Sequence, residues 1–157
     1  MHRIYLAIIA VLAAVILYFA LGKGPSDTDP PVTTPAPSRS VAVLRFVALG
    51  DAADALAATL SDEIAVNLTA APDIVVMVDR SPIPVRESIR ATTRRLGTRF
   101  ALEGAVSQRD GTVRVTAQLV DGDTEAHLWA ETYERNPSEL PIVAEEIAAV
   151  VVRALTR

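Results

Sequence analysis

The chain contains no cysteine, only two histidines and only one tryptophan among its 157 residues. The absence of cysteine excludes disulfides, thiolate metal sites and a cysteine nucleophile. Because His2 and His127 are the only imidazoles, a stable transition-metal site lacks ligands. The net charge of −4 and the pI of about 5.1 leave no global positive field that would draw the chain to nucleic acid.

The sequence also lacks the motifs of common enzymes. His127 is the only candidate base for a Ser-His-Asp arrangement, but it lies within an expected strand and no G-x-S-x-G motif is present. The loop 47–50 joins a strand to a helix without a glycine-rich fingerprint, and Asp51 and Asp54 would repel a phosphate there. We therefore expect no enzymatic activity, no cofactor and no metal.

One long apolar run opens the chain. Residues Ile4 to Leu21, with Leu12 near the middle, are uncharged and would form a helix about 27 Å long, just enough to cross a bilayer. The sequence predicts that residues 1–22 are a transmembrane anchor, with a cleaved signal peptide as the alternative, since Ala20 and Gly22 could precede a cut. Both interpretations place the rest of the chain outside the cytoplasm, so we expect a single-pass protein of the inner (cytoplasmic) membrane with a soluble periplasmic domain.

A proline-rich linker follows over residues 23–39, where repeated prolines and the absence of hydrophobic periodicity predict an extended tether. The folded domain is expected over residues 40–157. Its hydrophobic patterns predict a strand at Val41–Phe46, a helix at Asp51–Ala71 and a strand at Ile74–Val78. Pro82 and Pro84 are expected to open a helix at Val85–Leu96, which Gly97 caps, and a last helix starts at 136–138.

Residues 99–133 predict a meander of three antiparallel strands. Asp110-Gly111 is a strong hairpin signal between two alternating apolar runs. Folding there places Leu102 opposite Leu119 on a core face. The predicted fold is therefore α/β (α+β), in the order β-α-β-α-β-β-β-α, with helices packed on a mixed five-stranded sheet.

The other face of the meander is mostly polar yet carries the only tryptophan. If Trp129 is exposed among charged residues, this face has the composition of a protein interface; the alternative is that the tether or a chain end covers it. Arg86, Arg90 and Arg94 recur at helical spacing, and we interpret them as the solvated side of a helix rather than a nucleic-acid or lipid site. The predicted partner face consists of Arg114, Gln118, His127, Trp129, Glu131 and Tyr133, with Glu103 and Thr116 beside them.

Six stretches of the folded part match the pattern of a known family: Ser40–Phe46, Leu60–Ile64, Val85–Val106, Val113–Asp121, His127–Arg135 and Glu145–Ala148. On these stretches the folded part resembles the TolB amino-terminal-like domain, a bacterial domain found beside tetratricopeptide repeats, adenylate cyclases and membrane-bound regulators. Two positions depart from the family: Arg45 stands where proline is usual, and Thr124-Glu125 stands where Thr-Gly is usual. The resemblance implies an accessory, interaction or sensing module and brings no site residues.

We therefore expect a membrane-tethered periplasmic module that binds a protein partner, in scaffolding or signalling, and that binds no nucleic acid. The alternative is a small-molecule sensor of a membrane regulatory system, whose ligand would lie in a cleft at the strand ends.

Overall fold

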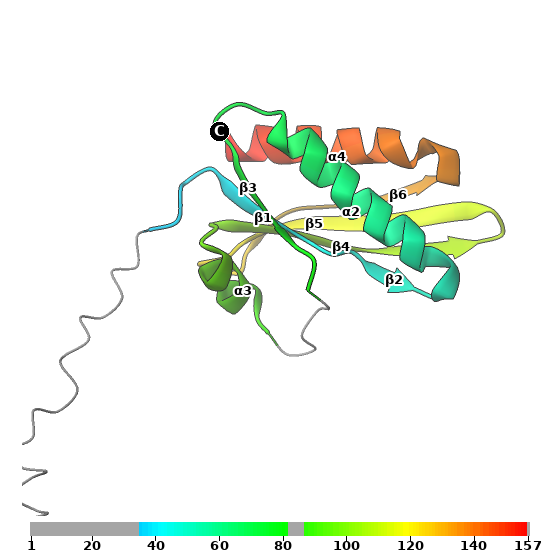
Figure 1. Ribbon diagram of the computed structural model, residues 1–157, viewed down its shortest axis with the longest axis horizontal. Coiled ribbons are helices and arrows are strands. Elements are labelled where there is room, and N and C mark those ends of the chain that lie inside the picture. Colours follow the sequence, from blue (N-terminus) through cyan, green and yellow to red (C-terminus); the bar gives the residue numbers. More distant parts are fainter. Residues whose placement is uncertain (1–34, 82–86, 157) are drawn as a thin grey trace, which may run out of the picture. The chain divides into compact units, whose positions relative to one another are not determined.

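A computed structural model describes residues 35–81 and 87–156 of the chain (Figure 1). The expected anchor, Ile4–Leu21, and the linker up to residue 34 lie outside the described residues. Within the described ranges, no helix has the length and hydropathy to cross a membrane.

The described residues form six strands and three α-helices. The strands are β1 (Ser40–Leu44), β2 (Val47–Leu49), β3 (Val75–Asp79), β4 (Phe100–Arg109), β5 (Thr112–Asp121) and β6 (His127–Arg135). The α-helices are α2 (Asp54–Thr69), α3 (Ile89–Leu96) and α4 (Leu140–Leu155).

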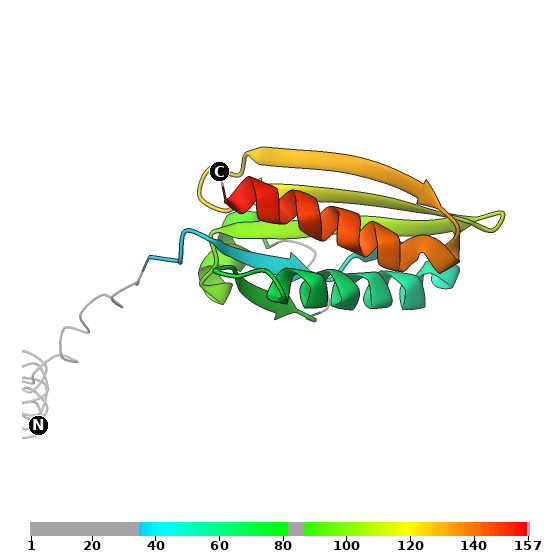
Figure 2. The same ribbon diagram turned by 90° about the horizontal axis from the view of Figure 1, so that it is seen from above.

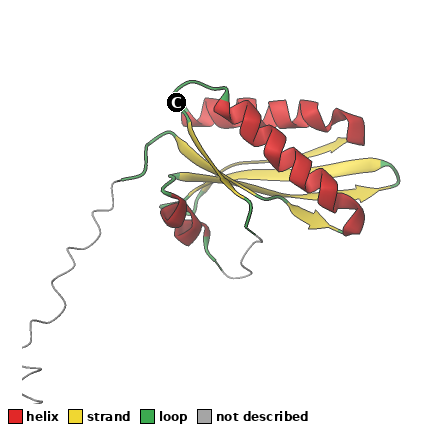
Figure 3. Cartoon of the chain, viewed as in Figure 1, coloured by secondary structure: helices red, strands yellow, loops and turns green. Residues whose placement is uncertain are grey.

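The strands form one mixed sheet in the order β3-β1-β4-β5-β6, with β2 also paired to β4 (Figure 3). Strands β1, β2 and β3 run parallel to their partners, whereas β4, β5 and β6 form the antiparallel meander that the sequence predicts. The predicted register of β4 and β5 is confirmed, because Leu102 faces Leu119 and Glu103 faces Gln118. The turn residues Asp110 and Gly111 both have positive φ, as a two-residue hairpin of type I′ requires.

Helices cover the two faces of the sheet unequally. Helices α2 and α4 lie side by side across one face, which we call the upper face (Figure 2). Helix α3 lies at one end of the opposite, lower face (Figure 1). The chain passes from β1 through α2 to the edge strand β3, and then from β3 through α3 to β4 on the other side of β1. Because these two right-handed crossovers run in opposite directions along the sheet, α2 and α3 lie on opposite faces.

The main core lies between the upper face and helices α2 and α4. Alternate residues of the strands point into it, because side chains alternate between the faces with period 2. Ala144 and Ala148 of α4 are also buried and allow close approach to α2. The largest side chains with essentially no exposed surface are Phe46, Leu60, Ile64, Leu68, Leu102, Leu119 and Ile147.

The expected strand Val41–Phe46 is interrupted, which corrects two predictions. Val43 is opposite Leu102 and Val47 is opposite Ala105, so three residues of the first strand face two of β4. Pairing resumes as β2 in a stretch that was expected to be a loop, and the described sheet therefore has six strands rather than five. The extra residue bends the strand and turns Phe46 into the core.

Two contacts stabilise the interruption between β1 and β2. The backbone N–H of Phe46 donates a hydrogen bond of 3.0 Å to Ser61 Oγ on α2, which replaces the lost ladder bond. The Phe46 ring fills the space above Gly104: a Cβ built on Gly104 would lie 2.3 Å from Phe46 Cε1 and 2.2 Å from the Thr116 carbonyl oxygen. Only glycine fits at this position of β4.

Helix α3 begins later than expected, at Ile89 rather than Val85. Ser88 has extended backbone angles and caps the helix, since its Oγ accepts the N–H of Ala91 at 3.2 Å. Pro82 and Pro84 lie outside the described residues. The predicted cap at Gly97 is confirmed by its left-handed conformation.

Candidate functional site

The lower face is covered by α3 only in part. Ala42, Ala101 and Val120 are buried on this face, as are Thr92 and Thr93 of α3. Beyond α3, no element of the described chain covers the remaining strand surface, which Figure 1 shows below β4 and β5. We call this surface the open lower face and define it by Leu44, Val47, Leu49, Glu103, Ala105, Ser107, Arg114, Thr116 and Gln118.

The open lower face combines exposed apolar residues with a groove. The pairings of β2 with β4 place Val47 and Leu49 on this face, where 42% and 60% of their surfaces are exposed. The groove has a volume of about 310 Å³ and runs over β2, β4 and β5. Its lining consists of Leu44, Arg45, Val47, Glu103, Gly104, Ala105, Thr116 and Gln118.

Polar side chains on the lower face are paired with each other across the strands. Gln118 Nε2 donates to Glu103 Oε1 at 2.5 Å, and Arg114 forms an ion pair of 3.2 Å with Glu134. Arg45 is exposed at the rim of the groove and forms no ion pair with another described residue. The arrangement suits a partner that brings apolar groups to the centre and an acceptor to Arg45.

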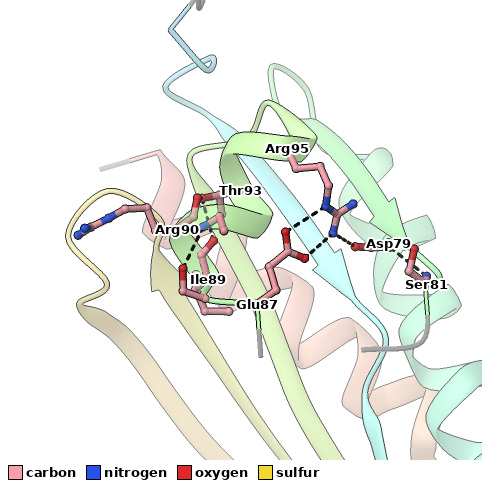
Figure 4. Close-up of polar contacts among 9 residues, drawn as sticks. Asp79, Ser81, Glu87, Ile89, Arg90, Thr93 and Arg95 are labelled. Atoms are coloured by element: carbon pink, nitrogen blue, oxygen red, sulfur yellow. Dashed lines mark hydrogen bonds and ion pairs between the residues drawn. The ribbon is translucent and has the colours of Figure 1, made fainter. Parts of the chain in front are cut away.

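A second feature lies beside the groove, where β3 ends and α3 begins. The guanidinium of Arg95 bridges Asp79 Oδ2 at 2.7 Å and Glu87 Oε2 at 3.1 Å, and Asp79 also accepts the N–H of Ser81 (Figure 4). The hydrogen bonds from Arg95 lower the pKa of both carboxyl groups, and the two carboxylates raise the pKa of Arg95. Both acids are therefore ionised at neutral pH and joined to one cation.

The cavity at this ion cluster is too small for a metabolite. Its volume is about 50 Å³, room for one or two water molecules, whereas ligand pockets usually exceed about 300 Å³. The cluster instead ties the end of β3 to the last turn of α3 and to Glu87, which precedes that helix. Among the described residues, no group of histidine and acidic side chains is placed to hold a metal ion.

One arginine of the predicted basic stripe, Arg90, is held by acceptors. Arg90 donates to the Asp123 carbonyl oxygen at 2.7 Å and lies 3.7 Å from Glu125 (Figure 4 shows Arg90 pointing away from Arg95). Arg94 is exposed and forms no ion pair with another described residue, and Arg86 lies outside the described residues. These contacts favour a structural role for Arg90 and agree with a solvated position for Arg94.

The predicted partner face is divided by the structure. Its members on β5, Arg114 and Gln118, lie on the lower face. The pairing of β6 with β5 instead places Trp129 opposite Leu119, Glu131 opposite Ala117 and Tyr133 opposite Val115, all on the upper face. The expectation that these residues share one face is therefore wrong.

A shift of register on β6 separates His127 from Trp129, Glu131 and Tyr133. The pairing is irregular between Leu119 and Val120, so that His127 rather than Leu128 faces Val120, and His127 returns to the lower face. Tyr133 is only 5% exposed and its hydroxyl donates to Glu131 at 3.2 Å. Burial and the nearby carboxylate raise its pKa. Val47 and Leu49, which sequence reasoning assigned to a loop, are the apolar residues that it missed.

Comparison with known proteins finds one relative by sequence and several solved structures of similar fold. A Rhizobium meliloti (strain 1021) protein named as a candidate adenylate cyclase, adenylate cyclase 3, is 33% identical over 132 residues, which are 81% of this chain. The chain spans only 22% of that protein's length. No family model matches the sequence.

Two solved structures share the fold. The PelC dodecamer from Paraburkholderia phytofirmans has a TM-score of 0.54 and 25% identity, over 76% of this chain and 89% of PelC. TolB from Acinetobacter baumannii has a TM-score of 0.57 and 15% identity, over 80% of this chain and 30% of TolB. The expected resemblance to the TolB amino-terminal-like domain is thus confirmed for the fold.

Proposed function

We propose that this domain is a non-enzymatic accessory module that binds a protein partner through the open lower face. The observation that carries the proposal is the pair of exposed apolar side chains, Val47 and Leu49, on a strand surface that α3 leaves uncovered. Large exposed apolar residues beside a groove mark interaction sites more often than isolated ones do. Arg114 and Gln118 form its polar rim.

A protein partner suits this surface better than a small molecule. The groove lies along the sheet and has a volume at the lower end of the range for ligand pockets. A sensor would need convergent polar groups within an enclosed pocket, whereas Glu103 and Gln118 already satisfy each other. One apolar side chain of a partner, flanked by a carboxylate or carbonyl oxygen for Arg45, fits the volume and the charge.

The comparisons support a role as one module among others. PelC is a dodecamer, so a domain of this fold can act through contacts between protein chains. The Rhizobium protein is several times longer than the part that this chain matches. We propose a scaffolding or signalling role for the domain, with any catalysis of such systems belonging to other domains or proteins.

We further propose that the domain works in the periplasm, tethered to the inner membrane by residues Ile4–Leu21. The length and the absence of charge in that run support a membrane anchor. A reporter that is active only outside the cytoplasm, fused after Arg157, should be active. Activity of a cytoplasm-only reporter at the same position would contradict the topology while leaving the binding surface to be tested separately.

Site-specific cross-linking tests the binding surface. A photo-reactive residue placed at Leu49 in the membrane-bound full chain should yield a discrete adduct with a second protein. The matched control is Val66 on α2, which is 69% exposed and lies away from the sheet. Leu49→Asp should reduce capture from a probe at Val47 at least tenfold, whereas Val66→Asp should leave it unchanged. Equal adducts from Leu49 and Val66 would contradict the proposal.

A further inference from the structure

The outer edge of β6 is the longest open strand edge in the described part of the chain. Strand β6 has nine residues, whereas β3 has five and β2 has three. Its partner on one side is β5, and its other side carries no strand or helix of the described chain (Figure 2). Edge strands are usually protected by lysine, proline, other charges or bulges. His127–Arg135 contains no lysine or proline, its irregular pairing is confined to its first residues, and its charges are of both signs.

The regular part of β6 has a defined centre. The shift near Leu128 disrupts the first two residues, and from Trp129 to Arg135 the pairing with β5 is continuous. Thr132 is the midpoint of these seven residues. It is exposed on the lower face, where its hydroxyl lies 3.3 Å from that of Thr116.

We propose that two copies of this chain pair antiparallel through their β6 edges, around a twofold axis at Thr132. An axis perpendicular to the sheet places residues of the same face opposite each other, so Thr132 faces its own copy. Glu131 then faces Tyr133 of the second copy, and Trp129 faces Arg135. No like charges lie directly opposite each other in this register, and Glu131 is diagonal both to its own copy and to Arg135 of the second copy.

The charges distinguish this register from its neighbours. An axis at Glu131 would set two carboxylates directly opposite each other, which is destabilising. An axis at Tyr133 would leave Trp129 without a strand partner. With the axis at Thr132, the guanidinium of Arg135 lies against the indole of Trp129 and diagonal to Glu131, which combines a cation–π contact with charge attraction.

Helix α4 adds an apolar contact beside the same edge. Glu146 lies 4.0 Å from Arg135 of β6, so this side of α4 borders the strand. Ile142 is one helical turn earlier on the same side and is 53% exposed. Pairing of the two edges would bring the two copies of this helix side together and cover Ile142.

Single-cysteine cross-linking tests the axis, because the chain has no cysteine of its own. The full chain is purified in detergent and oxidised. Thr132→Cys should give a disulfide-linked dimer, since opposed residues have Cα atoms about 4.5–5.5 Å apart. Ala130→Cys alone should give at least tenfold less, because its two copies would lie about 14 Å apart. Ala130→Cys mixed with Glu134→Cys should cross-link.

Charge exchange provides an independent test that does not depend on oxidation. Thr132→Lys and Thr132→Glu should each be monomeric in light scattering, and an equal mixture should restore the dimer. Met77→Lys, on the edge strand β3, is the control and should leave the dimer intact. Far-UV circular dichroism checks that the exposed substitutions leave the fold unchanged.

Three outcomes would overturn the proposal. The first is that the parent chain remains a monomer at the highest soluble concentration and that Thr132→Cys forms no disulfide-linked dimer. The second is equal cross-linking of Ala130→Cys and Thr132→Cys, which would indicate mere proximity in the micelle. The third is loss of the dimer in Met77→Lys but not in Thr132→Lys, which would place the contact at β3. If Leu49→Asp abolishes partner capture while the dimer stays intact, the result supports the binding surface on the lower face and shows that the dimer does not depend on that surface.

Discussion

Leu119 on β5 and Trp129 on β6 are direct cross-strand partners, and both side chains belong to the upper face of the sheet. Leu119 has no exposed surface, and Trp129 packs at the border of the same core. The indole thus closes the β6 side of the core. Its single occurrence in the chain reflects packing rather than partner recognition on the lower face.

Trp129→Ala should therefore destabilise the domain by about 2–3 kcal/mol, and Leu119→Ala by about 2–5 kcal/mol, because each removes buried apolar atoms. Urea unfolding of residues 35–157 measures both. The double variant should differ from additivity by at least about 0.5 kcal/mol, since the two residues are in contact. Additive losses, or a loss below about 0.5 kcal/mol for Trp129→Ala, would contradict this packing.

Gly104→Ala should destabilise the domain by about 1–3 kcal/mol or more, because the added methyl group meets the Phe46 ring and the Thr116 carbonyl oxygen. Combining it with Phe46→Leu should recover little of the loss, since the backbone oxygen cannot move aside. Ala105→Ser, on the lower face next in the chain, is the control and should change the unfolding free energy by less than about 0.5 kcal/mol. A neutral Gly104→Ala would show that β4 can shift.

Ser61→Ala should cost about 1–3 kcal/mol, because it leaves the buried N–H of Phe46 without an acceptor. Ser61 also donates to the Ala57 carbonyl oxygen, so the hydroxyl links α2 to the interruption of the first strand. Hydrogen exchange at the Phe46 amide gives a specific readout and should accelerate in Ser61→Ala more than at neighbouring core amides. Uniform acceleration would mean that only global stability changed.

Acidification should weaken the ion cluster of Arg95. The folded-state pKa values of Asp79 and Glu87 are lowered, so their stabilisation is complete above the ordinary carboxyl pKa of about 4 and is lost as the pH falls below it. Arg95→Met should thus reduce the unfolding free energy at pH 7, and the difference from the parent chain should shrink between about pH 4 and pH 2. A difference that stays constant over this range would show that Arg95 acts through packing alone.

The sequence predicts the parts of this fold that depend on local patterns. The alternation around Asp110-Gly111 gives the register of β4 and β5, and Gly97 gives the end of α3. The interruption at Phe46 has no local signal, because it depends on Ser61 and Gly104, which are distant in the chain. The sequence pattern assigns the faces of β6 wrongly, because Ala126, Leu128 and Ala130 form an alternating apolar series. In the structure, the larger apolar area of Trp129 and Tyr133 decides which face of β6 is buried.

The departure at Thr124-Glu125 is also explained by the backbone. Glu125 has a φ of 58°, a left-handed conformation that glycine adopts without strain. The Thr-Gly of the TolB amino-terminal-like family fits this geometry better, and Glu125 is held there by its proximity to Arg90. Residue identity alone could not reveal this strain.

The central position of β1 has a consequence for the order in which the domain can assemble. Strand β1 leaves the ribosome before its neighbours, yet it is held between β3 and β4, and Ser40 Oγ accepts the N–H of Arg99, 59 residues later. The nascent β1 can pair with β3 first, but its other edge stays unpaired until β4 has been made, while the meander can close through short hairpins. We expect substitutions at Val115 to slow folding and those at Val43 mainly to speed unfolding. A chain halted before Phe100 would leave unpaired the edge of β1 that belongs to β4.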